Sequence, residues 1–156
     1  MSPYRWLVLF SLVFCLIASN FIMMTFSTVS GIISDVYEVR LAMVSSCVSV
    51  FLISSIIMQI PSVYIIEKFG LSYSFKLAAI LTIGGSWLRF ICLGSFDNFE
   101  ILMAPQSLIA LANPIITNGI SKTAYRWFGD KERAVAISFG ALGTPIGCMA
   151  GLLLGP

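Results

Sequence analysis

The charged residues of this 156-residue chain are widely spaced and leave long uncharged stretches between them. An α-helix needs about 20 consecutive apolar residues to cross a hydrocarbon core about 30 Å thick. The stretches are continuously apolar, without the alternation of a membrane β-barrel strand, and this pattern indicates helices. The sequence therefore predicts an all-α integral membrane fold with five transmembrane helices, over about 6–33, 42–66, 73–93, 101–121 and 134–155.

The third predicted span is the only one that a charge interrupts. Arg89 lies in its outer third, and apolar residues follow it. A long basic side chain near a helix end can extend to the headgroup region. The loops predicted between the spans are short, so no soluble domain fits between them, and the chain is expected to be one transmembrane domain.

The composition supports lipid as the surrounding medium. Hydrophobic residues make up 58% of the chain and charged residues 10%, against about 45–50% and 25% in soluble domains. A soluble protein of this size could not bury so much apolar surface in its own core. The net charge of +2 is small and spread over short loops, which argues against a nucleic-acid partner.

The basic residues are distributed unequally between the two predicted sides of the membrane. One side carries seven: Arg5, Lys68, Lys76, Lys122, Arg126, Lys131 and Arg133. The other side carries Arg40 and Arg89, together with the acidic residues Asp35, Glu38, Asp97 and Glu100. Because basic loops stay in the cytoplasm, we expect a multi-pass protein of the plasma membrane or an organelle, with a cytoplasmic N-terminus.

Neither a metal site nor a catalytic centre is indicated. The chain has no histidine, and its cysteines, Cys15, Cys47, Cys92 and Cys148, lie in four separate apolar runs. Disulfide frameworks and zinc sites need closer or paired spacings, so we interpret the cysteines as packing residues. No nucleophile–base set or phosphate-binding loop is present. We therefore expect no enzyme activity, no cofactor and no metal.

Several polar side chains lie inside the predicted spans: Asn20, Gln59, Gln106, Asn113 and Asn118. In hydrocarbon each needs a hydrogen-bond partner or a wet cavity. They are candidates for a substrate path, and the alternative is that they join helices by hydrogen bonds.

The turn after the second span contains Glu67, Lys68 and Gly70. Glu67 could pair with Arg126 or Arg133 and form an inner gate, and the alternative is an ordinary solvated turn.

Glycines recur at short intervals along the fifth span: Gly140, Gly143, Gly147 and Gly151. Such a ridge of small residues lets another helix approach closely, either in this chain or in a partner. Prolines also lie in the apolar runs at Pro61, Pro105, Pro114 and Pro145. Each is expected to bend its helix, although proline is also simply commoner in membrane helices than in soluble ones.

Several segments together resemble a known family. The first is YRWLVLFSLVFCLIASN, and the others are IPSVYIIEKFGLSYSFKL, GGSWLRF, QSLIALANPIITNGISKTAYRWFGDKERAVA and LGTPIGCMAGLLLGP. They are similar to the N-terminal part of a major facilitator superfamily transporter, and within it to the feline leukaemia virus subgroup C receptor-related group, whose members carry choline, ethanolamine or haem.

The resemblance implies positions for the substrate path and the gate. Met24 stands where choline-carrying members have a tryptophan, Asn113 where they have a glutamine, and Glu67 where the superfamily has an aspartate. The family has two halves with the substrate held between them, and the match covers part of one half. The chain is therefore either a fragment or a short protein that needs further spans or a membrane partner.

Two functions remain open from the sequence. The first is transmembrane transport of a small organic solute, choline-like, ethanolamine-like or haem by the resemblance. The alternative is a membrane scaffold or accessory subunit without transport, which packs on a partner through the glycine ridge of the fifth span.

Overall fold

The computed structural model describes residues 4–36, 40–93, 101 and 103–154, and all secondary-structure elements in this part of the chain are α-helices. They are α1 (Tyr4–Thr28), α2 (Ser30–Val36), α3 (Leu41–Phe69), α4 (Leu71–Leu93), α5 (Met103–Trp127), α6 (Asp130–Ala141) and α7 (Gly143–Leu154). The acidic residues Glu38, Asp97 and Glu100 lie outside the described residues. The predicted all-helical fold is confirmed.

Four stretches of the described residues are long and apolar enough to cross a membrane: Tyr4–Thr25, Val44–Phe69, Leu71–Cys92 and Asp130–Leu154. Helix α5 has 25 residues but is more polar, because Gln106, Asn113 and Asn118 lie within it. The last of the four stretches includes both α6 and α7.

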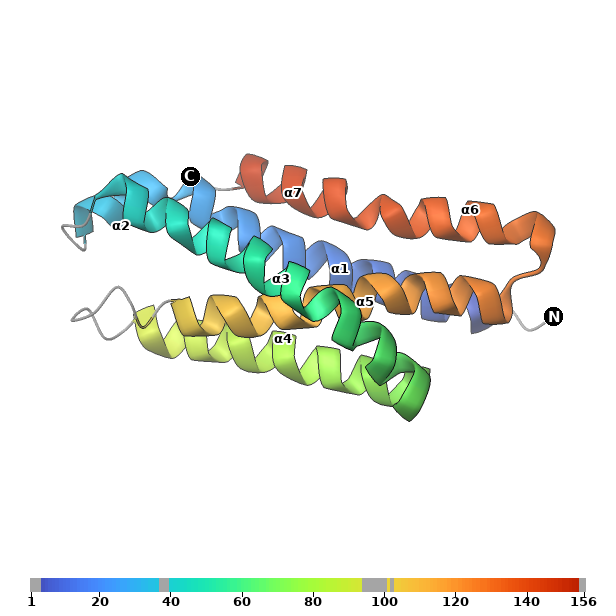
Figure 1. The fold of residues 1–156 in the computed structure, drawn as a ribbon. Helices are drawn as coiled ribbons and strands as arrows, with labels where there is room; N and C mark the ends of the chain where they lie inside the picture. The colour runs from blue at the N-terminus through green and yellow to red at the C-terminus, as the bar shows by residue number, and fades with distance from the viewer. Residues whose placement is uncertain (1–3, 37–39, 94–100, 102, 155–156) are drawn as a thin grey trace.

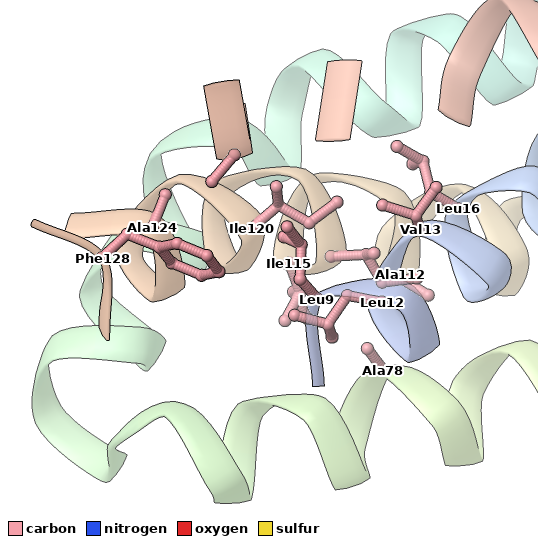
Figure 2. Close-up of a cluster of buried hydrophobic side chains, with 12 residues drawn as sticks. Leu9, Leu12, Val13, Leu16, Ala78, Ala112, Ile115, Ile120, Ala124 and Phe128 are labelled. Carbon is pink, nitrogen blue, oxygen red and sulfur yellow. The ribbon is translucent and has the colours of Figure 1, made fainter. Parts of the chain in front are cut away.

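Helix α5 is the most polar of the long helices, and several of the others pack against it. It packs against α1, α3, α4 and α6, and α1 packs in turn against α7 (Figure 1). The main apolar core forms where α1 crosses α5, and Figure 2 shows its side chains meeting between these helices. Leu9 and Leu16 on α1, and Ile115 on α5, are at most 1% exposed. The other helices thus cover α5 over most of its circumference.

The glycine ridge packs inside this chain. A Cβ atom added to Gly147 would lie 2.6 Å from the backbone oxygen of Ile17 on α1. One added to Gly151 would lie 2.7 Å from Cβ of Met24, and one added to Gly143 would lie 3.1 Å from a Leu16 methyl carbon. Helix α1 is therefore the neighbour that the ridge of α7 admits, as close approach through small residues requires.

Gly140 lies one turn before this ridge, on α6, and has a different neighbour. A Cβ atom at Gly140 would collide with the side chain of Ile120 on α5. The four glycines of the predicted ridge thus serve two contacts, three on α1 and one on α5.

Two predicted spans are divided in the structure. The expected helix 6–33 ends at Thr28, and α2 begins after Val29. The fifth span is divided between α6 and α7 at Leu142. Pro145 lacks the N–H that a continuous helix would use to bond the carbonyl of Ala141, which explains this second break.

The turns at the end of the bundle that includes the N-terminus are shorter than predicted. Gly70 alone separates α3 from α4, with a φ of 82° that favours glycine. The expected loop 122–133 is wrong, because α5 continues to Trp127 and α6 begins at Asp130. The charged residues of 122–133, which the prediction placed in a loop, therefore lie on α5 and α6, outside the predicted spans.

The basic residues collect at one end of the bundle. Helix α1 begins there, α3 ends and α4 begins there, and α5 ends and α6 begins there (Figure 1). All seven basic residues assigned to one side by the sequence are on these helix ends, which we name the basic end. Arg40 directly precedes the start of α3 and Arg89 lies near the end of α4, so both lie toward the opposite end of these helices, which we name the far end.

Candidate functional site

Polar side chains from α3 and α5 meet in a hydrogen-bonded group. The amide of Gln59 donates from Nε2 to Oδ1 of Asn118 over 3.3 Å. Asn118 donates from Nδ2 to Oγ of Ser62 over 2.7 Å, and the same nitrogen lies 3.4 Å from the backbone oxygen of Gln59. Ser62 is one turn beyond Gln59, so one face of α3 supplies both partners of Asn118.

The polar face continues along α5 toward the far end. Thr117 donates to the backbone oxygen of Asn113 over 3.0 Å, and its hydroxyl lies 3.4 Å from Oδ1 of Asn113. Ser55 of α3 donates to the backbone oxygen of Ala110 over 3.1 Å. We name Gln59, Ser62, Asn113, Thr117 and Asn118 the amide stripe.

The amide stripe is accessible on the surface of this chain. Gln59 and Thr117 are exposed, and Asn113 and Asn118 are half-buried. The stripe contains hydroxyl and amide groups but no charged side chain. It can therefore donate and accept hydrogen bonds to a polar molecule or to water, and it supplies no acid or base.

Asn20 and Met24 do not join the stripe. The Asn20 amide donates from Nδ2 to the backbone oxygen of Leu16 in its own helix over 2.8 Å. Its side chain is 4% exposed, and its Cβ lies 2.9 Å from the position of a Cβ added to Gly147. Met24 lies one turn further along α1, against Gly151. Both residues therefore line the contact between α1 and α7.

Gln106 is placed differently from every other predicted polar residue. It is 1% exposed, and neither its amide nitrogen nor its amide oxygen has a hydrogen-bond partner. The Oγ atom of Ser19 on α1, which is completely buried, also has none. Gln106 thus lies inside the bundle and is separate from the amide stripe.

The predicted gate residues lie at the basic end. Glu67 pairs there with a residue other than Arg126 or Arg133, the two partners that the sequence analysis considered. Glu67 pairs with Lys122 of α5 at 3.3 Å, one turn before Arg126. Arg133 pairs with Asp130 at 3.0 Å and lies 4.7 Å from the ring centroid of Tyr125. The first pair joins the end of α3 to α5, whereas the second stays within α6.

A cavity of about 350 Å³ lies beside the first of these pairs. Its lining includes Glu67, Gly70, Lys122 and Arg126. Lys68, the remaining predicted gate residue, instead places its ammonium 5.4 Å from the ring centroid of Tyr64. The structure therefore brings Glu67, Gly70 and Arg126 together and leaves Lys68 and Arg133 apart from them.

A third ion pair at the basic end was also missed by the sequence analysis. Arg5 of α1 pairs with Glu132 of α6 at 2.7 Å, and its guanidinium carbon lies 5.1 Å from the ring centroid of Phe128. Trp6 meets the same ring edge-on at 4.9 Å between centroids. The contact fixes the short turn between α5 and α6 against the start of α1.

The described residues contain no group of three or more histidine, cysteine, aspartate or glutamate side chains that could hold a metal ion. Their four cysteines are free thiols. The polar groups that the structure gathers are thus neutral hydrogen-bonding groups on α3 and α5, and ion pairs at the basic end.

Comparison with known proteins identifies the family. The sequence model of the major facilitator superfamily matches residues 6–156. The chain belongs to the major facilitator superfamily. This superfamily member is therefore related to membrane carriers, as the sequence resemblance indicated.

Curated relatives cover nearly all of the chain at modest identity. The mouse choline/ethanolamine transporter FLVCR1 is 28% identical over 158 residues, which are 100% of this chain and 28% of the mouse protein. An uncharacterised MFS-type transporter of Caenorhabditis elegans is 28% identical over 153 residues, 97% of this chain and 26% of that protein.

A third relative is solute carrier family 49 member A3 of Danio rerio. It is 27% identical over 157 residues, which are 97% of this chain and 33% of the fish protein. The chain thus spans about a quarter to a third of the length of the relatives that it matches.

Some members of the stripe could have been found from the sequence. Ser62 follows Gln59 by three residues, and Thr117 follows Asn113 by four, which places each pair on one helix face. Serine and threonine are common in membrane helices as packing residues, so this spacing alone does not separate a site from packing. Lys122 was missed as the partner of Glu67, although it lies one turn before Arg126, which the sequence analysis did consider.

Proposed function

We propose that this superfamily member transports a small polar organic solute across a membrane, with the amide stripe of α3 and α5 facing the solute's path. The observation that supports this proposal is a polar face on α3 and α5 in which Gln59 and Thr117 are exposed and Asn113 and Asn118 are half-buried. Amide groups are costly to place in lipid and are usually found facing a protein interior or a water-filled cavity. Superfamily members hold their substrate between two halves, and a polar face on one half suits that arrangement.

Helix α5 is proposed to cross the membrane together with the four more apolar stretches, which makes five crossings. Its polar groups are tolerated because α1, α3, α4 and α6 surround it. The basic end is proposed to be cytoplasmic, because basic residues near helix ends favour that side. This orientation places the N-terminus and the Glu67–Lys122 pair in the cytoplasm.

For the gate we propose the ion pairs at the basic end, with Glu67, Lys122 and Arg126 around the cavity described above. An exposed pair contributes little stability, about 1 kcal/mol or less. It can therefore open and close at small cost, as a gate that cycles during transport requires.

The substrate is proposed to be a small organic molecule that forms hydrogen bonds with neutral groups. The stripe has no charge, so a charged solute would need a counter-charge or an aromatic face elsewhere in the protein. Choline and ethanolamine are the first compounds to test, because relatives such as the mouse FLVCR1 are named as their transporters. Haem is a further candidate substrate to test.

The scaffold alternative is not favoured. It requires an open glycine ridge that a partner helix can approach, and Gly143, Gly147 and Gly151 already face α1 of this chain. A partner would have to displace α1 to use them.

The test is solute uptake by the full-length protein in proteoliposomes, with labelled choline, ethanolamine, haem and uncharged polyols. The double variant Gln59→Leu with Asn118→Leu removes both partners of one hydrogen bond. Ser62 loses Asn118 as a donor, but its hydroxyl keeps its bond to the backbone oxygen of residue 59, so no buried donor is left unpaired. We expect uptake of the true substrate to fall at least tenfold. The matched control is Ile80→Ala on α4, which is 67% exposed and distant from the stripe, and we expect it to leave uptake within twofold.

Two results would contradict the proposal. One is an unchanged uptake in the double variant while the protein remains folded by thermal unfolding. The other is the absence of uptake for every solute tested while the purified protein forms a defined complex with another membrane protein.

A further inference from the structure

Arg89 of α4 forms a long-range hydrogen bond at the far end of the bundle. Its Nη1 donates to the backbone oxygen of Ile22 on α1 over 3.1 Å, between residues 67 apart in the sequence. The principal packing neighbours of α4 are α5 and α3, not α1. The guanidinium therefore adds a polar contact between α4 and α1 at the far end.

The acceptor lies between one and two turns before the junction of α1 and α2. Helix α1 ends at Thr28 and α2 begins at Ser30. Three hydroxyl groups bond to nearby backbone oxygens here: Thr25 to Phe21 at 2.8 Å, Thr28 to Thr25 at 3.1 Å, and Ser30 to Ser27 at 2.9 Å. Such bonds compete with the helical ladder and often bend helices. The segment after Ile22 can therefore turn about this region.

Two buried polar groups on α1 and α5 lack partners. Ser19 is four residues before Met23 on α1, and Gln106 is three before Ile109 on α5, and Met23 and Ile109 share one apolar cluster. Ser19 is fully buried and Gln106 is 1% exposed, and neither side chain has a hydrogen-bond partner. Buried polar groups without partners are rare and mark a site that needs an explanation.

We propose that Arg89 is a positioning residue that holds the far segment of α1 in one of two states of the carrier. In the second state Arg89 releases the Ile22 carbonyl, the chain bends at the junction of α1 and α2, and Gln106 and Ser19 gain hydrogen-bond partners. Each state thus satisfies groups that the other leaves unpaired. This inference rests on the proposed transport function, because a carrier needs two such states.

The experiment measures the position of α2 relative to α4 in the full-length protein reconstituted in lipid nanodiscs. Spin labels are attached to cysteines that replace Ile32 on α2 and Ile80 on α4, which are 53% and 67% exposed. The four native cysteines are replaced beforehand. Distance distributions are recorded for the labelled parent, for Arg89→Met and Arg89→Lys, for Gln106→Leu, and for Arg40→Met as a matched control at the same end.

We expect Arg89→Met to raise the population of a second distance about tenfold, because hydrogen bonds from charged groups are among the stronger ones. Arg89→Lys keeps the charge and should restore part of the parent distribution. Gln106→Leu removes the unpaired amide, so it should shift the populations in the opposite direction and slow transport. Arg40→Met should leave the distances unchanged.

The proposal is overturned if Arg89→Met and Arg89→Lys both give the parent distribution, or if Arg40→Met produces the same shift. It is also overturned if Gln106→Leu increases the second population. The distance response and solute uptake are separate readouts. A protein that shows the expected distances but moves no solute would refute the proposed function and leave the role of Arg89 intact.

Discussion

The contact between α7 and α1 can be tested with two glycine substitutions of opposite expected effect. In Gly147→Ala the new Cβ would lie 2.6 Å from the Ile17 backbone oxygen and 3.1 Å from the Ile17 Cα. Backbone atoms cannot rotate away, so the two helices must separate. In Gly84→Ala, on the exposed side of α4, the new Cβ has nothing within 4 Å. Both changes are glycine to alanine within a helix, so they differ only in what the methyl group meets.

The magnitudes follow from two opposing terms. Alanine is favoured over glycine inside a helix by about 0.8–1 kcal/mol. Overpacking a tight contact costs about 1–3 kcal/mol. Gly84→Ala gains only the first term and should be more stable than the parent. Gly147→Ala includes both terms, so we expect it to be less stable than Gly84→Ala by about 1–3 kcal/mol.

The assay is thermal unfolding in detergent, followed by a thiol-reactive dye. Cys47 is fully buried and Cys92 is 8% exposed, so their reaction with the dye reports loss of the folded state. Equal unfolding temperatures for Gly147→Ala and Gly84→Ala would show that α7 does not pack on α1 at Gly147, and the reasoning would fail.

Three further predictions concern the basic end. Gly70→Ala should destabilise the protein by about 1–3 kcal/mol, because the backbone φ at this position is 82°. A Cβ atom added there would have no neighbour within 4 Å, so the effect comes from the backbone alone. A melting temperature equal to the parent's would contradict this prediction. Arg5→Met should cost clearly more stability than Lys122→Met in the same assay, since the Arg5 side chain is 14% exposed and that of Lys122 is 51%. Lys131 should react with a membrane-impermeant amine reagent only in permeabilised cells, and its labelling in intact cells would reverse the proposed orientation.

The sequence predicted the helices well because the membrane imposes a simple rule on them. The uncharged stretch 42–66 gave α3 within a few residues, and the span 73–93, which was continued through Arg89, gave α4 within a few residues. The boundaries at the basic end were less accurate, because the prediction ended a span at its first charge. A helix that leaves the membrane continues as long as its own hydrogen bonds are favourable, and α5 reaches Trp127 in this way.

The candidate site was predicted in part. Gln59 and Asn118 were singled out as buried polar residues, and the structure brings them into one hydrogen-bonded group. Asn20 was assigned to the same path, but its amide bonds to its own helix and its side chain packs against α7. Polarity within a span shows that a side chain needs a partner. Which helix supplies the partner depends on rotation about the helix axis and on long-range packing, and neither is encoded locally.

The position of α5 has a consequence for biogenesis. This helix is the least suited of the long helices to partition into lipid by itself, and α1, α3, α4 and α6 pack against it. If α5 crosses the membrane as proposed, it must enter the bilayer with the help of α1, α3 and α4, which are synthesised before it. Insertion and tertiary folding are thus a single event for α5, and a substitution such as Gly85→Leu on α4, whose Cβ would meet Ile109 and the Pro105 carbonyl, should appear as failed integration of a helix that carries no mutation.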